Sequence, residues 1–207
     1  MMVEIKNIRT KAGVNYLTEA EEKLLFNLLK NRKDKQGERD FVLLKLCRAT
    51  GLRRGEAVAL NVGDVINKSK IDVNERIAEK GAVGEVYLSV EIQDIFKRFF
   101  KLKRLWKESM DMEAPLFVSR KGHRLSPRSF NDIMSKWCVL ANIPRFTPHC
   151  LRHTKGQRIM SDVRFLSDEE RQKALLFANR QLRHKSLNAT MVYCCPNKEE
   201  MQRVARI

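Results

Sequence analysis

Five short patches along this chain hold side chains that could do chemistry together. In chain order they are Arg53 with Glu56, Lys80, the run 149–153, His184 and Tyr193. Guanidinium and ammonium groups bind phosphate oxygens, and a phenol acts as a nucleophile when its surroundings activate it. Cations that precede a lone phenol near the C-terminus therefore suggest chemistry on a nucleic-acid backbone, with tyrosine as the nucleophile.

The first two patches each have a second interpretation. Arg53 follows an expected helix end and can present a planar fork to two phosphate oxygens, with Glu56 placed to orient it. The alternative is an ordinary surface ion pair between residues three apart. Lys80 lies at an expected hairpin turn, where its ammonium could donate a proton to a leaving oxygen. The alternative is a solvated turn lysine.

The run 149–153 carries two histidines and an arginine. On a helix, His149, Arg152 and His153 share one face, and they lie in the first turns after Thr147-Pro148, where free backbone N–H groups favour an anion. The rival is zinc, because His149 and His153 have the spacing of a ligand pair. Against zinc, residue 150 is cysteine, so the glutamate of the metalloprotease helix motif is missing, and no third ligand is obvious nearby.

The last patch requires a break in the chain. His184 and Tyr193 are nine residues apart, and at ~100° per residue one continuous helix would place them on opposite faces. The segment 186–188 offers a break, with Asn188 as a good N-cap for a short following helix. The alternative is a buried tyrosine and a separate histidine near a helix end.

The elements that would position these patches are mostly helices. Thr18 with Glu21 has capping-box spacing, Gly51 is a helix stop, and Ser126 and Ser167 each begin a helix. Residues 31–39 are expected to form a loop. Alternating apolar residues over 69–90, with Gly81 and Gly84 at a turn between the second and third strands, predict a small antiparallel sheet. The predicted fold class is mainly α with one such sheet (α+β).

Residues 92–108 are expected to form a strongly amphipathic helix. Its apolar side chains face inward, and six basic side chains cover much of the rest. These are Lys97, Arg98, Lys101, Lys103, Arg104 and Lys107. A basic helix face of this kind is usually solvated.

Composition points to a polyanionic partner. The 207 residues include 41 Lys and Arg against 25 Asp and Glu, for a net charge of +16, and 43% are hydrophobic, enough for a packed core. The alternative is a generally basic soluble protein. No stretch has the length of a membrane span or the apolar core of a signal peptide. Five irregularly spaced cysteines argue against a disulfide framework and for a reducing cytoplasm.

Taken together, the patches resemble those of the tyrosine recombinases, the phage-integrase family. Residues 50–53 with Glu56 look like the first arginine box of the family, and 79–81 followed by 86–90 is similar to its lysine hairpin. Residues 149–153 match its H-x-L-R-H box. His184 and Tyr193 have its histidine-to-tyrosine spacing. The resemblance runs from about residue 17 to residue 193 and implies a catalytic-domain-like fold.

The resemblance implies a role for each residue. Tyr193 would attack the scissile phosphate and become joined to a DNA 3′-phosphate, while Arg53 and Arg152 would bind the non-bridging oxygens. His149 and His184 would assist in phosphate binding and proton transfer, and Lys80 would protonate the departing 5′-oxygen. Glu56 would support the site, and His153 would shape the helix rather than react. No cofactor and no metal are implied.

The chain departs from the family pattern in three places. The usual Leu-Gly-His is here Leu182-Arg183-His184, and 160–171 is the expected insertion. Only about sixteen residues precede the first helix, so no DNA-clamping domain is expected within the chain. We expect an N-terminal extension over 1–16, the catalytic domain over 17–196, and a tail over 197–207 that packs on a neighbouring subunit.

The predicted function is site-specific DNA recombination by a cytoplasmic, nucleoid-associated enzyme that forms a tetramer on double-stranded DNA, with a host or accessory recombinase as a further partner and no membrane association. One alternative is a non-catalytic DNA-binding regulator of a full-length recombinase, which the three departures would suit. Another is a type IB topoisomerase-like relaxase, which shares the chemistry but not the sequences of these motifs.

Overall fold

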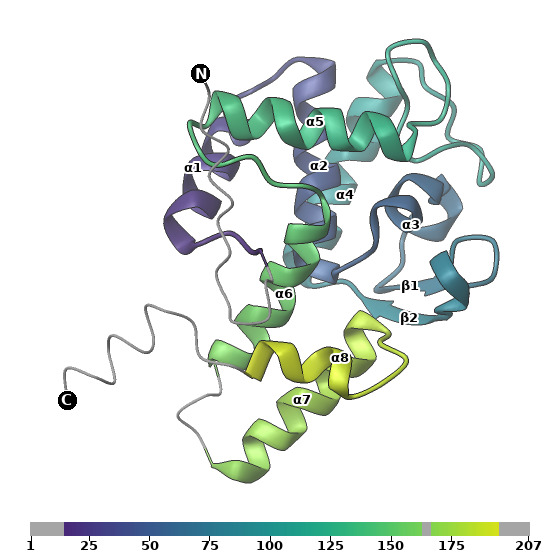
Figure 1. Cartoon of the computed structure of the whole chain (residues 1–207). Helices are drawn as coiled ribbons and strands as arrows, with labels where there is room; N and C mark the ends of the chain where they lie inside the picture. The colour runs from purple at the N-terminus through teal and green to yellow at the C-terminus, as the bar shows by residue number, and fades with distance from the viewer. Residues whose placement is uncertain (1–14, 163–166, 195–207) are drawn as a thin grey trace.

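The computed structural model describes residues 15–162 and 167–194, which form helices around a long central helix, with one small sheet at the side (Figure 1). The longer helices are α1 (Glu19–Lys30), α2 (Lys35–Thr50), α4 (Val90–Leu105), α5 (Pro127–Leu140), α6 (His149–Asp162) and α7 (Asp168–Leu182). The short ones are α3 (Arg54–Ala59), α8 (Asn188–Met191) and the 3-10 turns η1 (Val62–Asp64), η2 (Glu79–Gly81) and η3 (Val192–Cys194). The predicted fold class is confirmed.

Local caps set the helix starts. The capping box of Thr18 and Glu21 is present at α1, Ser126 caps α5, and Ser167 caps α7. The predicted loop over 31–39 was too long. The side chain of Asp34 accepts a hydrogen bond from the Gly37 N–H, so α2 begins at Lys35.

The sheet has two strands in the described chain, where the sequence predicted three. β1 (Lys70–Val73) pairs antiparallel with β2 (Gly84–Tyr87), and buried Ile71 lies opposite buried Val86. The chain leaves β2 early because the Ser89 side chain caps α4, which starts at Val90 rather than at 92. The predicted strand between β1 and β2 is absent, because the connection over the described residues 74–83, which carries Lys80, forms turns in which the N–H groups of Ile77 and Ala78 bond to the Asn74 carbonyl.

The main core surrounds α2, which contacts α1, α4 and α6. Leu43, Leu44 and Leu46 are all fully buried, so α2 is apolar on most sides, as a central helix must be. A second, smaller cluster joins α6, α7 and η3, and Tyr193 belongs to it. In Figure 1, α7 and α8 lie at the lower end of α6, below α2 and α5.

The expectation that α4 carries a solvated basic face was wrong for Lys103. This lysine is fully buried, and its ammonium donates to the Glu108 carboxylate at 2.7 Å and to the Leu116 carbonyl at 3.2 Å. A buried ammonium is tolerated only when paired in this way. Arg98 also pairs, with both carboxylate oxygens of Glu38.

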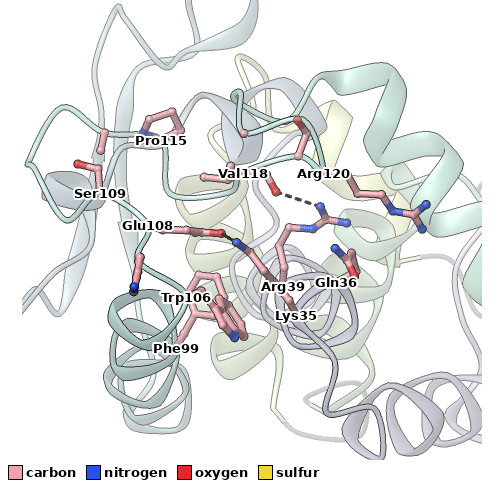
Figure 2. Close-up of a pocket in the computed structure, with 14 residues that line it drawn as sticks. Lys35, Gln36, Arg39, Phe99, Trp106, Glu108, Ser109, Pro115, Val118 and Arg120 are labelled. Carbon is pink, nitrogen blue, oxygen red and sulfur yellow. Dashed lines mark hydrogen bonds and ion pairs between the residues drawn. The ribbon is translucent and has the colours of Figure 1, made fainter.

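A pocket of about 450 Å³ opens between the start of α2 and the end of α4 (Figure 2). Its charged groups are paired within the protein: Lys35 with Glu108 at 2.8 Å, and Arg39 with the Val118 carbonyl at 2.9 Å. None of the predicted site residues is among its described lining. No helix among the described residues is long and apolar enough to cross a membrane.

Candidate active site

Three of the predicted residues share one pocket. Arg53, Lys80 and His149, which come from the start of α3, from η2 and from the start of α6, line a space of about 470 Å³. Lys80 has a positive φ of 57°, so its backbone adopts the left-handed conformation within this turn. Burial, followed by the charges of Arg152, Arg53 and Lys80, lowers the pKa of the His149 imidazole.

Glu56 is the partner of Arg53. Its carboxylate accepts the Arg53 backbone N–H and a guanidinium N–H, both at 2.8 Å. Glu56 is fully buried, so this is not an ordinary surface ion pair. Burial alone would raise the pKa of Glu56, but the charge of Arg183 and the hydrogen bonds from Arg53 outweigh it and hold the pKa below its usual value. The carboxylate thus stays ionised and orients Arg53.

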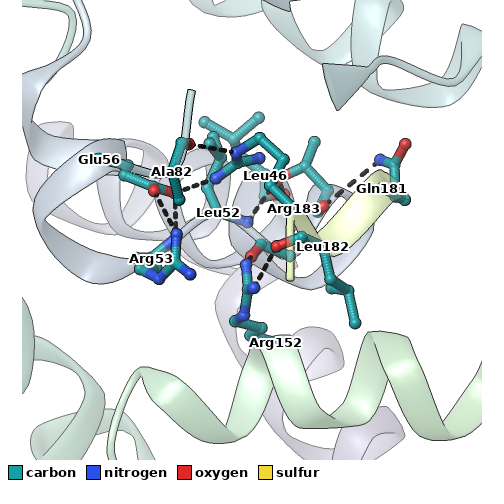
Figure 3. A network of polar contacts seen from close by, with 11 residues as sticks. Leu46, Leu52, Arg53, Glu56, Ala82, Arg152, Gln181, Leu182 and Arg183 are labelled. Carbon is teal, nitrogen blue, oxygen red and sulfur yellow. Dashed lines mark hydrogen bonds and ion pairs between the residues drawn. The ribbon is translucent and has the colours of Figure 1, made fainter. Parts of the chain in front are cut away.

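Arg152 joins two helix ends. Its guanidinium donates to the carbonyl of Gly51, just past α2, at 2.6 Å and to the carbonyl of Leu182 at the end of α7 (Figure 3). Gly51 has φ 75°, the left-handed conformation expected of a helix stop. Burial and neighbouring cations lower the pKa of Arg152 to about 10, so it remains charged at neutral pH.

Tyr193 and His184 converge, and the break predicted between them is confirmed. Helix α7 ends at Leu182 and the two rings stack with centroids 6.2 Å apart. The predicted cap was off by one: Leu187 takes the N-cap position without a side-chain bond, and Asn188 is the first residue of α8. The Tyr193 hydroxyl is buried and lies 2.8 Å from His153 Nδ1.

Burial raises the pKa of Tyr193 to about 12, with the charge of Arg152 opposing the rise. The phenol is therefore a poor nucleophile in this structure. The imidazoles around it are neutral as well. Burial and neighbouring charges lower the pKa of His153 to about 3 and that of His184 to about 4. A phosphate entering this cluster would favour the protonated histidines again.

His153 was expected only to shape its helix, but its ring lies against the hydroxyl of Tyr193. Its ring also meets that of His149 edge-on, with centroids 4.3 Å apart. Within the described residues no group of three or more His, Cys, Asp or Glu side chains could hold a metal ion. The zinc interpretation of the pair at 149 and 153 therefore finds no third ligand in that part of the chain.

Two further residues of the site were missed. Thr190 Oγ1 lies 2.7 Å from His184 Nδ1 and accepts a hydrogen bond from Asn179, so it orients the imidazole. Gly156 lies under the Tyr193 ring, where an added Cβ would come within 2.5 Å of a ring carbon. The signal for Gly156 was available, because glycine within a helix costs about 1 kcal/mol and usually marks a close approach.

Gly156→Ala is expected to slow the DNA cleavage predicted from the sequence about a hundredfold. The methyl group would push the Tyr193 ring from its seat on α6, and a misplacement of about 1 Å can cost that much. Alanine favours the helix by about 1 kcal/mol, which offsets part of the overpacking cost, so the thermal midpoint should fall by no more than a few degrees. Single-turnover cleavage and thermal melts check both effects, and cleavage at the wild-type rate would show that the seat of the ring does not matter.

Acidification is expected to destabilise the protein. Unfolded histidines titrate near 6.5, whereas His153 and His184 have pKa values of about 3 and about 4 when folded. The unfolded chain therefore binds more protons below 6.5, and stability falls as pH falls. Between pH 7.5 and 5.5 we expect a loss of about 1–2 kcal/mol, or about 3–8 °C in thermal midpoint.

Thermal melts at several pH values test this expectation. His153→Gln should flatten the pH dependence, while the same change at exposed His123 should leave it as in the wild type. A midpoint that does not move between pH 7.5 and 5.5 would contradict the buried, neutral state of the two histidines.

Comparison with known proteins identifies the class. Residues 15–200 match the model of the phage integrase family, so the chain belongs to this family. It is 27% identical over 167 residues to tyrosine recombinase XerC of Roseiflexus castenholzii, covering 78% of this chain and 48% of that one. It is 24% identical over 197 residues to XerS of Lactococcus lactis subsp. cremoris, covering 93% and 52%. The chain thus spans about half the length of these curated relatives.

Solved structures agree on the fold. The crystal structure of XerA recombinase superposes with a TM-score of 0.70 at 24% identity, covering 92% of this chain and 62% of that one. XerH recombinase bound to its difH substrate superposes with a TM-score of 0.66 at 20% identity, covering 93% and 54%. The expected insertion over 160–171 comprises the end of α6, four residues outside the described ranges and the first turn of α7. The expected tail over 197–207 lies outside the described residues.

Proposed function

We propose that this chain is the catalytic part of a site-specific DNA recombinase, which cuts and rejoins DNA through a covalent 3′-phosphotyrosine. One observation carries the proposal: the Tyr193 hydroxyl lies in a cluster with Arg152, His153 and His184, next to the pocket of Arg53 and Lys80. A protein that only bound DNA would need positive charge but not this arrangement around a phenol. Membership of the phage integrase family supports the same conclusion.

In the proposed reaction Tyr193 attacks the scissile phosphorus. A bond forms between phosphorus and the phenolic oxygen as the bond to the 5′-oxygen breaks. The phenolic proton passes to a neutral imidazole, and His153 is the one already in hydrogen-bond contact. Lys80 gives a proton to the departing 5′-oxygen. The new phosphodiester retains the free energy of the old one, so rejoining reverses these steps without ATP.

Charge stabilisation comes from the arginines. Arg53 and Arg152 bind the non-bridging oxygens, assisted by His149 and His184. Donors held in place before the reaction cost no reorganisation as charge develops. The buried carboxylate of Glu56 and the two carbonyls bound by Arg152 fix the guanidinium groups. The phosphate itself completes the site, because its negative charge offsets the surplus of cations.

Double-stranded DNA is the proposed partner, and the net charge of +16 suits it. The XerH structure similar to this chain contains its difH substrate. We propose a homotetramer on DNA, with subunit contacts through 197–207 and a further contribution from a host or accessory recombinase. Under this proposal residues 17–196 form the catalytic domain, 1–16 an extension, and the protein acts in the cytoplasm on nucleoid DNA.

Covalent capture from a random pool tests the proposed function. Duplexes with a nick close to the random region lose a short fragment after cleavage, so the enzyme remains attached. A denaturing gel should show a protein–DNA adduct, and sequencing the captured DNA should give the target. Label on the 3′-phosphate side should stay with the protein. Tight binding without any adduct would favour a regulator, and relaxation of supercoiled DNA without strand exchange would favour a topoisomerase.

A further inference from the structure

Arg183 occupies a costly position. It follows α7 with φ 50° and ψ 50°, a left-handed conformation that disfavours a long side chain by about 1 kcal/mol or more. Its side chain is nevertheless buried, with 7% of the residue exposed. A buried guanidinium is stable only when its surroundings bind it. The structure shows what binds this one.

The guanidinium of Arg183 connects three segments that are far apart in the chain (Figure 3). It donates to the Glu56 carboxylate on α3 and, through Nε, to the Ala82 carbonyl at 3.1 Å. Its aliphatic part passes over Gly84, where an added Cβ would lie 3.1 Å from Arg183 Cδ. Glu56 is thus held between Arg53 and Arg183, and the turn after Lys80 is held by the segment that carries His184.

We propose that Arg183 is the positioning residue for Lys80. The Lys80 turn contributes no buried side chain of its own among residues 79–81, so its placement depends on contacts made by its neighbours. The bond from Arg183 to the carbonyl of Ala82, two residues after Lys80, anchors the turn to Glu56 and to the end of α7. Arg183 thereby places the Lys80 ammonium beside Arg53 and His149, ready to protonate the leaving oxygen.

This inference rests on the proposed function, and its chemistry predicts a specific rescue. A 5′-oxygen is a poor leaving group and needs a proton, whereas a sulfur atom in the same bridging position leaves as a stable thiolate without one. A defect caused by misplaced Lys80 should therefore largely vanish on a substrate with 5′-bridging sulfur. A defect in phosphate binding or in the nucleophile should persist on both substrates.

The variants are Arg183→Met, which keeps a long apolar stem but makes neither hydrogen bond, and Arg183→Gly, which also removes the backbone strain. At saturating DNA, both should cleave the oxygen substrate about 10- to 100-fold more slowly than the wild type. Both should bind DNA within about threefold of the wild type. On the sulfur substrate the deficit should shrink to about threefold or less, as it should for Lys80→Ala.

Asn142→Gly is the matched control for the backbone. Asn142 is exposed and also left-handed, with φ 51°, so glycine there changes only the backbone preference, and we expect wild-type cleavage. The proposal is overturned if Arg183→Met and Arg183→Gly cleave like the wild type, or if sulfur fails to rescue them while it rescues Lys80→Ala. If Arg183→Met does not fold, the results for Arg183→Gly alone decide between these outcomes. If the wild type forms no adduct in the same assay, the proposed function fails and this inference with it.

Discussion

Tyr193→Phe is expected to abolish the covalent DNA adduct, with a loss of more than about a thousandfold. Phenylalanine lacks the oxygen that attacks phosphorus in the proposed reaction, which is the oxygen that lies 2.8 Å from His153 Nδ1. The phenyl ring should still pack on Gly156 and stack with His184. Losing one hydrogen bond costs only about 1 kcal/mol, so the protein should remain folded.

DNA binding separates a chemical defect from a structural one. Affinity of Tyr193→Phe for the captured target, measured by fluorescence anisotropy, should lie within about twofold of the wild type, since the hydroxyl is buried and adds no net charge. Tyr87→Phe is the control, because Tyr87 is exposed on β2 and should cleave normally. An adduct that survives in Tyr193→Phe would assign the nucleophile elsewhere.

Arg152→Lys is expected to lower the cleavage rate by about 10²–10³, although the charge is kept. A guanidinium can bridge the carbonyls of Gly51 and Leu182 while it presents a planar edge to a phosphate, and a single ammonium cannot do all of this. Removing one preorganised donor from an anionic transition state typically costs that much. Because the two buried carbonyls lose a donor, the thermal midpoint should also fall by several degrees.

Arg158→Lys on the same helix is the matched control. Arg158 forms an exposed pair with Glu19 at 2.8 Å, and the same substitution there should leave both cleavage and stability nearly unchanged. Cleavage should be measured by single turnover well below the thermal midpoint of each variant. If Arg152→Lys cleaves as fast as Arg158→Lys, Arg152 does not bind the phosphate in the transition state.

Local sequence signals predicted the helix starts well, but they failed where contacts between distant segments determine the structure. The capping side chains of Thr18, Ser126 and Ser167 bond to backbone groups within three residues, so the sequence could predict these helix starts. The predicted strand before Gly81 was wrong because this segment turns on itself, with the N–H groups of Ile77 and Ala78 bonded to the Asn74 carbonyl, and the last strand ended early because Ser89 caps α4. The burial of Lys103 could not be predicted from its own helix, because one of its partners, the Leu116 carbonyl, belongs to a loop that follows the helix.

The site shows the same division. The spacing of residues on a helix was enough to predict that His149, Arg152 and His153 lie together. The rotation per residue of an α-helix was enough to predict a break between His184 and Tyr193. The contact between His153 and the phenol spans 40 residues, and the contact between Arg183 and Glu56 spans 127. No local pattern encodes such distances. The catalytic roles inferred from resemblance stay predictions until cleavage is measured.

Mass spectrometry of the trapped complex tests the central claim most directly. The captured adduct is digested with nuclease and protease, and the peptide that carries a nucleotide is sequenced by fragmentation. We expect one modified peptide, with a 3′-nucleotide phosphate on the phenolic oxygen of Tyr193. A nucleotide on another side chain, or cleaved DNA ends with no protein attached, would contradict a site in which Arg53, Arg152 and the histidines hold a phosphodiester for attack by that tyrosine.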